Sequence, residues 1–284
     1  MTNIKFLNLA TPNWCPGCGD FGILLSLQQA IAELNIEQHN LLLVSGIGCS
    51  SKIPYWVKVY GFNSLHGRAL PVAIGAKLAN NKLNVVVAGG DGDGYGEGGN
   101  HFLHAMRRNI DITYLVHNNQ IYALTTGQAS PSTEEGDKNK VYPHGVIERP
   151  IQALAIAVAN GATFVARGFA GNVPHLTDLI KQAIQHKGFA LIDIAQPCVT
   201  FNHHNTYDFF RQRIYDLQKE GHDFKNKTKA FEKALEWGEK IPIGIIYKEE
   251  RKTFEEKYPQ IAKKPLSQHD ISFVDIQKAM DKMC

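Results

Sequence analysis

The sequence has no long uninterrupted run of apolar residues. None of its runs approaches the roughly 18 residues that a membrane-spanning helix needs, and residues 1–10 lack the long apolar core of a secretory signal. A large excess of one charge is also missing, because 30 basic residues stand against 27 acidic ones. Nucleic acid and anionic membrane surfaces are therefore not expected as main partners. With 44% apolar and 20% charged residues among 284, we expect a globular cytoplasmic protein without a membrane span.

Cysteine is scarce and occurs in an odd number. Five cysteines in a chain without an export signal argue against a disulfide framework. Four of them lie in turns rich in glycine and proline, which allow several sulfurs to approach one another. The candidate metal ligands are therefore Cys15, Cys18, Cys49 and Cys198. Cys284, at the end of the sequence, has no evident partner and no expected role.

Apolar runs alternate with segments of helical periodicity over the first two thirds of the sequence. The predicted strands are residues 41–44, 84–88, 112–117, 163–167 and 190–195. The predicted helices are residues 21–34, with Asp20 as the N-cap, and residues 68–80, 98–108, 151–160 and 175–186. This alternation indicates an α/β fold with an open, doubly wound and mostly parallel sheet. Ligands of such sheets bind at the carboxyl ends of the strands.

The character of the sequence changes near residue 205. Residues 211–284 hold 16 basic and 13 acidic side chains, and no further glycine-rich strand–turn–helix unit follows. We therefore expect an α/β domain at residues 1–204 and a charged, mainly helical C-terminal extension at residues 205–284. The extension is either a solvated appendage of the core or a docking surface for a partner. Within the first part, the long polar segment 125–148 is expected to be a functional loop.

Two polar motifs follow two neighbouring predicted strands. Gly90-Asp91-Gly92 comes after the second strand, and Asn118-Asn119 comes after the third. One helix and one strand separate the motifs, so a βαβ unit would place Asp91 and Asn119 side by side. Carboxylate and amide oxygens suit octahedral Mg²⁺, and glycine lets backbone amides approach a diphosphate. A lone Gly-Asp-Gly also occurs in ordinary turns, whereas the pair at this spacing favours a metal–diphosphate site.

Together with four further motifs, this pair resembles the thiamine diphosphate signature of a known family. The motifs are WCPGCG at 14–19, GIGCS at 46–50, LHGRA at 65–69 and TGQASP at 126–131. Over roughly residues 11–210, the sequence is similar to the β subunits of 2-oxoacid:ferredoxin oxidoreductases, the pyruvate and 2-oxoglutarate synthase family. The resemblance implies the thiamine diphosphate-binding fold, with the domain type that holds the diphosphate.

The resemblance implies ligands for two inorganic groups. Asp91 and Asn119 match the side-chain ligands of Mg²⁺, and Ile121 matches the residue that offers a backbone carbonyl. A 4Fe–4S cluster is held by four thiolates, and the family's ligands match Cys15, Cys18, Cys49 and Cys198. Structural zinc on four cysteines is the alternative, although zinc sites favour paired Cys-x-x-Cys units and this sequence has one.

The resemblance also implies which residues contact the cofactor and the substrate. For His66 the expected role is cofactor contact, with capping of the following helix as the alternative. For Lys52 it is a charge offered to a substrate carboxylate, with simple solvation as the alternative. The substrate pocket is expected to include Lys52, Leu124 and Thr126. The expected cofactor-binding residues are Gly46, Ile47, Gly48, Cys49, Ser50, His66, Gly67, Gly90, Asp91, Gly92, Asp93, Asn119, Ile121, Tyr122, Ala123 and Leu124.

The implied reaction is the oxidative decarboxylation of a 2-oxoacid, 2-oxoglutarate and/or pyruvate, with coenzyme A as acyl acceptor and ferredoxin as electron acceptor. Thiamine enzymes also need a glutamate from a pyrimidine-binding domain, which this family carries on an α subunit. An αβ or α₂β₂ assembly is therefore expected, and this chain alone should be inactive. Two other functions remain open. A non-redox thiamine diphosphate-dependent decarboxylase or synthase subunit leaves the cysteines unexplained, and a non-catalytic iron–sulfur or zinc electron-carrier subunit leaves Asp91 and Asn119 unexplained.

Overall fold

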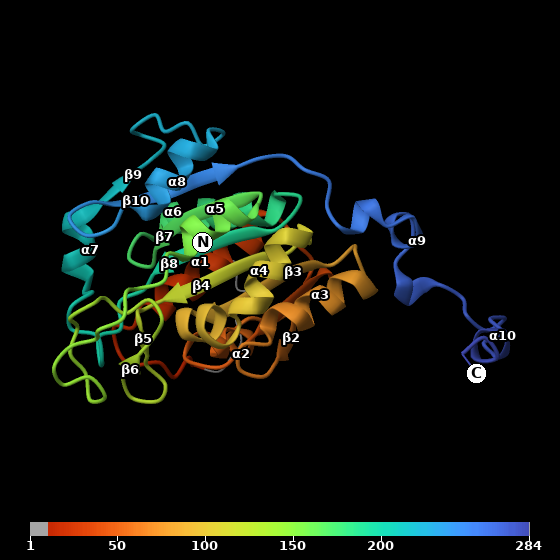
Figure 1. Cartoon of the computed structure of the whole chain (residues 1–284), viewed down its shortest axis with the longest axis horizontal. Helices are drawn as coiled ribbons and strands as arrows, with labels where there is room; N and C mark the ends of the chain where they lie inside the picture. The colour runs from red at the N-terminus through yellow and green to blue at the C-terminus, as the bar shows by residue number, and fades with distance from the viewer. Residues whose placement is uncertain (1–10, 284) are drawn as a thin grey trace.

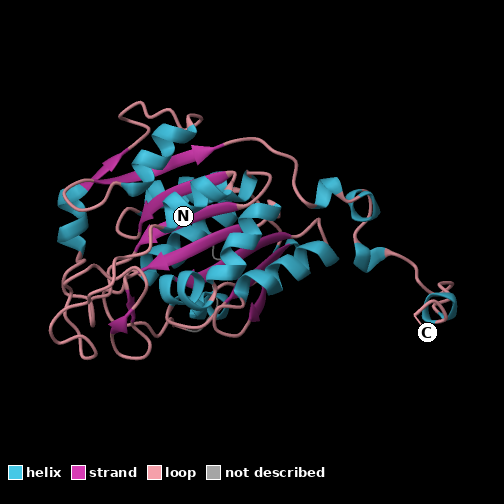
Figure 2. Ribbon diagram, viewed as in Figure 1, coloured by secondary structure: helices cyan, strands magenta, loops and turns pink. Residues whose placement is uncertain are grey.

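An eight-stranded sheet organises the chain (Figures 1 and 2). The computed structural model describes residues 11–283, so the expectations for residues 1–10 and for Cys284 lie outside the described residues. The strand order in the sheet is β2-β1-β3-β4-β8-β7-β10-β9, and every neighbouring pair is parallel except β7 and β10. In chain order the strands are β1 (Leu41–Ser45), β2 (Tyr60–Asn63), β3 (Asn84–Gly90), β4 (Thr113–Asn118), β7 (Phe164–Phe169), β8 (Ala190–Ala195), β9 (Ile214–Asp216) and β10 (Ile241–Lys248).

Helices cover both faces of the sheet, because successive strand side chains point to opposite faces. In β3, Val85 and Val87 belong to one apolar cluster, and Val86 and Ala88 belong to the other. The first cluster is covered by α3 (Ala69–Ala79), α4 (Gly99–Arg108), α5 (Ala153–Asn160) and α8 (Lys227–Leu235). The second is covered by α1 (Asp20–Glu33) and α6 (Val173–Gln185). This arrangement confirms the predicted doubly wound, mostly parallel α/β fold.

The first helix differs from the prediction in its capping. Gly19 is the N-cap residue of α1, and Asp20 is already the first helical residue. The Asp20 carboxylate points instead to His117 of β4. Asp20 is fully buried, so it stays inside the protein as a partner of His117 rather than as a cap.

The C-terminal part, predicted to be mainly helical, also adds two strands to the sheet. It contains α7 (Tyr207–Arg213) and α8, but β10 pairs antiparallel with β7 and β9 pairs parallel with β10. The sequence pattern did not reveal β10 because Pro242 and Gly244 interrupt its apolar run, and both residues weaken a strand prediction. Burial of Ile241, Ile243 and Ile245 on the faces of the sheet overrides that local preference.

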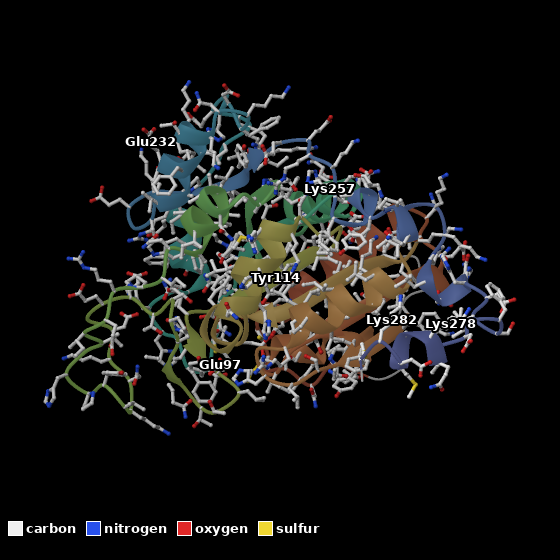
Figure 3. The ribbon with its side chains drawn as sticks, turned by 45° about the vertical axis from the view of Figure 1, so that its right-hand side comes forward. Glu97, Tyr114, Glu232, Lys257, Lys278 and Lys282 are labelled. Atoms are coloured by element: carbon white, nitrogen blue, oxygen red, sulfur yellow. The ribbon has the colours of Figure 1, made fainter. Side chains whose placement is uncertain are left out.

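The segment after β10 runs along the amino-terminal edge of the parallel strands and then leaves the body of the molecule (Figure 1). Figure 3 shows Lys278 and Lys282 on its outlying end. Its helical turns are η5 (Glu255–Lys257), α9 (Pro259–Ala262), η6 (Leu266–Gln268) and α10 (Gln277–Met280). Short turns earlier in the chain are η2 (Gln38–Asn40), η3 (Ser50–Lys52) and α2 (Ile53–Trp56).

The loops that follow the parallel strands meet at the opposite, carboxyl-terminal edge, on the left of Figure 1. A π-helical turn, η4 (Gly92–Glu97), follows β3. The two-residue strands β5 (Ile121–Tyr122) and β6 (Gln128–Ala129) form a small antiparallel pair after β4. In the described part of the chain, no helix has both the length and the apolar character that crossing a bilayer requires.

Candidate active site

A cleft at the carboxyl-terminal edge gathers most of the predicted cofactor positions. Its empty volume, with the open mouth included, is about 470 Å³. The residues that line it are Ile47, Gly48, Cys49, Ser50, His66, Gly90, Asp91, Gly92, Asp93, His117, Asn119, Ile121, Tyr122, Ala123, Leu124 and Thr125. Two predicted positions, Gly46 and Gly67, do not belong to this wall.

Gly46 and Gly67 support the cleft through Asp93. The buried Asp93 carboxylate accepts hydrogen bonds from the backbone N–H of Ile47 at 2.9 Å and from that of Gly67 at 2.8 Å. A Cβ on Gly46 would lie 1.9 Å from Asp93 Oδ2, so the chain can pass this carboxylate only with glycine there. Burial raises the pKa of Asp93, and the two backbone donors oppose that rise. Asp93 thereby joins the loop after β1 to the loop after β3.

Asp91 and Asn119 both line the cleft, as the motif spacing predicts. The Asp91 carboxylate is buried, and its Oδ2 accepts hydrogen bonds from the hydroxyls of Ser130 and Ser132, each at 2.5 Å. Burial raises the pKa of Asp91 to about 6, against the opposing effect of the two hydroxyls. Asn119 Oδ1 accepts a hydrogen bond from the backbone N–H of Ile121 at 3.1 Å. A cation bound at this carboxylate would reverse the rise in pKa.

Gly92 opens the π-helical turn η4 at the base of the cleft. The ring of Tyr122 packs so closely on it that a Cβ at residue 92 would lie 2.2 Å from the ring. Only glycine fits this position, and π-helical turns are frequent at functional sites. A glycine-rich backbone of this kind gives a diphosphate close access to main-chain N–H groups.

His66 lies at the rim of the cleft with a half-exposed side chain. Its Nε2 is 3.7 Å from Asp93 Oδ1 and 3.5 Å from Glu97 Oε2. Its ring meets the ring of Tyr122 edge-on, with the centroids 6.2 Å apart. The N-cap residue of α3 is Arg68. His66 therefore turns toward the cleft and not toward the helix that follows it.

A second cavity of about 630 Å³, here called the cysteine cavity, adjoins the cleft. Its wall includes all four predicted cluster ligands and the three predicted substrate-pocket residues. The residues that line it are Asn13, Trp14, Cys15, Cys18, Cys49, Lys52, Asn119, Ala123, Leu124, Thr126, Gln196, Cys198, Val199, Thr200 and Phe201. The residues common to both walls are Cys49, Asn119, Ala123 and Leu124.

The four thiols surround the cysteine cavity without converging on one point. Within residues 11–283, no three Cys, His, Asp or Glu side chains come together closely enough to hold a single metal ion. Cys18 Sγ accepts a hydrogen bond from Gln196 Nε2 at 3.3 Å and lies 3.5 Å from Asp20 Oδ2. Burial raises the pKa of Cys18 and raises that of Cys49 to about 11, and the Asp20 charge adds to both. A bound metal cation would oppose this rise and favour the thiolate forms of Cys18 and Cys49.

Four side chains at the site were not predicted from the sequence. Ser130 and Ser132 belong to the polar loop 125–148 and hold Asp91. Asp20 and His117 form a buried pair, with Oδ1 and Nδ1 2.6 Å apart. His117 lines the cleft, and its buried Nε2 has no hydrogen-bond partner among the described residues. The signal for His117 was its place directly before Asn118-Asn119, and Ser130 belongs to the TGQASP motif, whereas no local pattern indicated that Asp20 or Ser132 contacts the site.

The sheet and its glycine-rich cleft are those of a cofactor-binding domain of the thiamine diphosphate enzymes. Residues 46–194 match the family model described as "Thiamine pyrophosphate enzyme, C-terminal TPP binding domain". Residues 198–263 match the family model for the C-terminal region of the pyruvate ferredoxin oxidoreductase beta subunit. The second match covers the part of the chain that carries Cys198 and the strands β9 and β10.

Relatives extend these matches over most of the chain. The 2-oxoacid:ferredoxin oxidoreductase subunit beta of Saccharolobus solfataricus is 49% identical over 250 residues, which are 84% of this chain and 82% of the relative. The 2-oxoglutarate synthase subunit KorB of Archaeoglobus fulgidus is 38% identical over 248 residues, 87% of this chain and 89% of the relative. The chain belongs to the β subunits of the 2-oxoacid:ferredoxin oxidoreductases, which confirms the predicted family and its oxidoreductase function.

A solved structure shares the whole fold. It is the 2-oxoglutarate:ferredoxin oxidoreductase of Magnetococcus marinus with 2-oxoglutarate, coenzyme A and succinyl-CoA bound. The match has a TM-score of 0.91 and 39% sequence identity, and it covers 100% of this chain and 96% of that one. The C-terminal strands and the outlying segment are therefore part of a fold shared with a solved enzyme.

Proposed function

We propose that this β subunit holds thiamine diphosphate, Mg²⁺ and a 4Fe–4S cluster. Together with an α subunit it would catalyse the coenzyme A-dependent oxidative decarboxylation of a 2-oxoacid, with ferredoxin as electron acceptor. The observation that carries this proposal is the wall that the cleft shares with the cysteine cavity, formed by Cys49, Asn119, Ala123 and Leu124. A cofactor in the cleft and a cluster in the cavity would be neighbours, as electron transfer between them requires.

The residues of the cleft fit Mg²⁺ and a diphosphate. Asp91, Asn119 and the backbone carbonyl of Ile121 are hard oxygen donors, and Mg²⁺ commonly takes its remaining ligands from water and substrate phosphates. The hydroxyls of Ser130 and Ser132 would orient the Asp91 carboxylate, as partners of metal ligands commonly do.

The residues of the cysteine cavity fit a cluster better than zinc. A single Zn²⁺ draws four sulfurs to about 2.3 Å from one point, whereas a cubane cluster keeps its cysteine sulfurs apart at separate iron atoms. The thiols of Cys15, Cys18, Cys49 and Cys198 surround a cavity and do not converge. Four thiols with a single Cys-x-x-Cys pair, placed around a cavity of about 630 Å³, favour the cluster over the zinc alternative.

When bound, thiamine diphosphate supplies a carbanion that attacks the keto carbon and a ring that accepts the electrons of decarboxylation. The chain's own contribution is placement and exclusion of water. Trp14 and Phe201 give the cysteine cavity apolar walls, and Ala123 adds one on the side shared with the cleft. Apolar walls keep water away from the reacting groups and strengthen the electrostatic interactions inside.

Lys52 is the proposed contact for a substrate carboxylate. It lines the cysteine cavity together with Leu124 and Thr126, and its charge lowers the pKa of Cys49 against the larger effect of burial. The solved relative with 2-oxoglutarate bound makes that 2-oxoacid the first substrate to test. Lys52→Met should raise the KM for 2-oxoglutarate more than the KM for pyruvate, because 2-oxoglutarate carries a second carboxylate. Equal changes in the two KM values would indicate that Lys52 is solvated or contacts the 2-oxo end that both substrates share.

The rim of the cleft carries exposed apolar side chains that suit a covering α subunit. Leu65 is 75% exposed, Leu124 47% and Ile47 43%. Exposed apolar residues grouped around a site are typical of protein interfaces. The α subunit would close the cleft here and bring the pyrimidine-binding domain with its glutamate.

Purification of the chain with its α subunit in the absence of oxygen tests the proposal. We expect about four iron and four sulfide atoms per β subunit, together with thiamine diphosphate and Mg²⁺ and a broad visible absorbance that bleaches on reduction. Thiamine diphosphate without iron would favour the non-redox decarboxylase. Iron without thiamine diphosphate would favour the electron carrier, and zinc in place of iron would overturn the cluster.

A further inference from the structure

A buried carboxylate behind the cleft holds together the two loops that carry the proposed metal ligands. Asp193 of β8 is 4% exposed. The hydroxyl of Tyr95 donates a hydrogen bond to its Oδ2 at 2.7 Å. The amide of Asn118 donates to Oδ1 at 3.2 Å and to Oδ2 at 3.1 Å. The Asp193 carboxylate lines neither the cleft nor the cysteine cavity.

The two donors come from the two metal loops. Tyr95 lies in η4, the turn that begins directly after Asp91. Asn118 ends β4 and directly precedes Asn119. In the sheet, β4 lies between β3 and β8. The Asp193 side chain on β8 therefore extends past β4 to contact η4, the turn that follows β3. One carboxylate therefore fixes the position of Asp91 and of Asn119 relative to each other.

Arg167 supplies the charge that makes this carboxylate stable inside the protein. It is the neighbour of Asp193 in the pairing of β7 with β8, and it is also 4% exposed. Burial raises the pKa of Asp193, and Arg167 is the largest influence in the opposite direction. The guanidinium is itself fixed, because it donates to the backbone carbonyls of Ala234, Glu236 and Pro242.

We propose that Asp193 is a positioning residue for the metal–diphosphate site. It sets the separation of Asp91 and Asn119 through Tyr95 and Asn118, with Arg167 as its charge partner. This inference rests on the proposed function, since it assumes that Asp91 and Asn119 bind Mg²⁺. Carboxylates and hydroxyls that orient metal ligands commonly change metal affinity by 10–100-fold when they are removed.

The chain offers a matched control for the loss of a tyrosine–carboxylate hydrogen bond. Tyr247 is buried to the same degree as Tyr95 and belongs to the same apolar cluster. Its hydroxyl donates to Glu249 Oε2 at 3.1 Å, at the amino-terminal edge of the parallel strands. Tyr95→Phe and Tyr247→Phe therefore each remove one tyrosine–carboxylate hydrogen bond, at opposite edges of one sheet, with the Glu249 carboxylate 36% exposed and that of Asp193 buried.

The test is titration calorimetry of thiamine diphosphate and Mg²⁺ into the purified αβ complex. Tyr95→Phe should weaken Mg²⁺-dependent binding about tenfold, and raised Mg²⁺ should restore both binding and kcat. Tyr247→Phe should leave the affinity unchanged. Iron content should stay the same in both variants, because the cysteine ligands lie on other segments.

Asn118→Ala removes the other hydrogen-bond donor to the Asp193 carboxylate, and it should also weaken Mg²⁺-dependent binding of thiamine diphosphate. Unchanged affinity in both Tyr95→Phe and Asn118→Ala would overturn the positioning role. So would an equal loss in Tyr247→Phe, which would indicate general destabilisation. If the unsubstituted complex bound no Mg²⁺–thiamine diphosphate, the proposed function itself would fall and this inference with it.

Discussion

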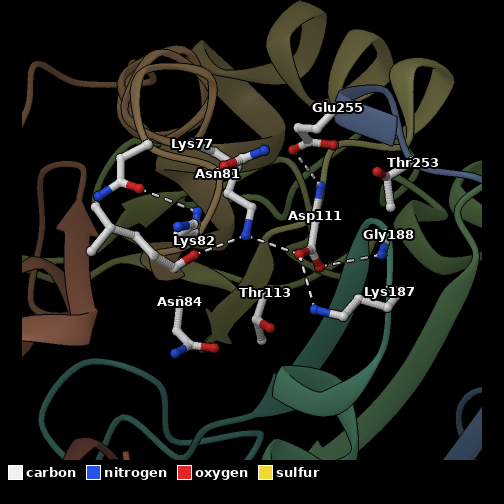
Figure 4. Close-up of polar contacts among 12 residues, drawn as sticks. Lys77, Asn81, Lys82, Asn84, Asp111, Thr113, Lys187, Gly188, Thr253 and Glu255 are labelled. Carbon is white, nitrogen blue, oxygen red and sulfur yellow. Dashed lines mark hydrogen bonds and ion pairs between the residues drawn. The ribbon is translucent and has the colours of Figure 1, made fainter. Parts of the chain in front are cut away.

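The two edges of the sheet differ in how many of their buried polar groups have a hydrogen-bond or ion-pair partner. At the amino-terminal edge, the charged groups satisfy one another (Figure 4). Lys77 is 4% exposed, and its Nζ lies 2.9 Å from Asp111 Oδ2 and donates to the carbonyl of Leu83 at 2.8 Å. Lys187 Nζ lies 3.5 Å from the same carboxylate, and the backbone N–H of Gly188 donates to Asp111 Oδ1 at 3.4 Å. This network joins loops before β4 and β8 and contributes to stability.

At the carboxyl-terminal edge, many buried polar atoms have no partner among the described residues. They are Ser50 Oγ, Ser51 Oγ, Asp93 Oδ2, His117 Nε2, Asn118 Oδ1, Gln120 Oε1 and Gln196 Oε1. At the other edge, Glu255 Oε2 and Arg251 Nε likewise have no hydrogen-bond partner in the described part of the chain. Unpaired buried polar groups cost stability unless a ligand or water satisfies them. The comparison indicates that one edge is built for stability and the other for ligands.

The largest expected effect is the loss of the cluster. Changing any one of the four cavity cysteines to serine should lower iron content and abolish ferredoxin reduction, because the cluster needs four thiolates. The variants are Cys15→Ser, Cys18→Ser, Cys49→Ser and Cys198→Ser. Iron analysis and visible absorbance of anaerobically purified complex provide the measurement. Cys284→Ser is the control and should change neither the iron content nor the reduction of ferredoxin. A full cluster in Cys198→Ser would remove that residue from the ligand set.

The next effect concerns the metal and its diphosphate. Asp91→Ala should weaken the binding of Mg²⁺ and thiamine diphosphate to the αβ complex by well over tenfold, because it removes a charged ligand from a buried site. The cluster should survive. Asp111→Ala removes a carboxylate from the opposite edge and should leave the cofactor affinity unchanged. Equal affinities for Asp91→Ala and the unsubstituted complex in titration calorimetry would defeat the metal assignment.

A smaller effect is expected at the amino-terminal edge, and on stability alone. Lys77→Met should lower the free energy of unfolding by about 2 kcal/mol, because it leaves the partly buried Asp111 carboxylate with only the longer contacts to Lys187 Nζ and the Gly188 N–H. Denaturant unfolding measures the change in the free energy of unfolding, and the affinity for thiamine diphosphate should not change. A weakened cofactor affinity in Lys77→Met would break the distinction between the two edges.

The last effect is a dependence of stability on pH at the same edge. Burial and the charge of Lys248 lower the pKa of His186 from 6.5 to about 4. The unfolded chain therefore binds a proton that the folded chain does not, so stability is full above pH 6.5 and falls between pH 6.5 and 4. The loss is about 1.4 kcal/mol per pH unit and about 3 kcal/mol at most. His186→Gln should flatten this part of the stability curve, and an unchanged slope would assign the loss to other groups.

Much of the carboxyl-terminal edge follows from local sequence patterns. Asp91 and Asn119 were predictable because each follows an apolar strand and parallel strands end at the same edge. The four cysteines were grouped as candidate metal ligands from their glycine- and proline-rich turns, and the resemblance to a family assigned them to an iron–sulfur cluster. The hydrogen bond from Ser130 to Asp91 was not predictable, because the two residues are 39 positions apart in the sequence.

The other features that the sequence did not predict depend on contacts between residues far apart in the sequence. Asp20 and His117 are 97 residues apart, and each has an ordinary local interpretation as a helix cap or a strand residue. The strand β10 depends on burial between β7 and β9, which no local pattern reveals in a run that contains proline and glycine. The prediction of a mainly helical C-terminal part was incomplete for that reason.

The most direct test is an anaerobic assay of the purified chain with and without its α subunit. The central claim is that the ligand-binding edge described above forms half of an active site. With the α subunit, we predict coenzyme A-dependent reduction of ferredoxin or a viologen dye by 2-oxoglutarate, pyruvate or both. Without it, the chain should hold its cluster yet turn over no 2-oxoacid. Appreciable turnover by the chain alone, with no second subunit detected by mass spectrometry, would contradict the claim.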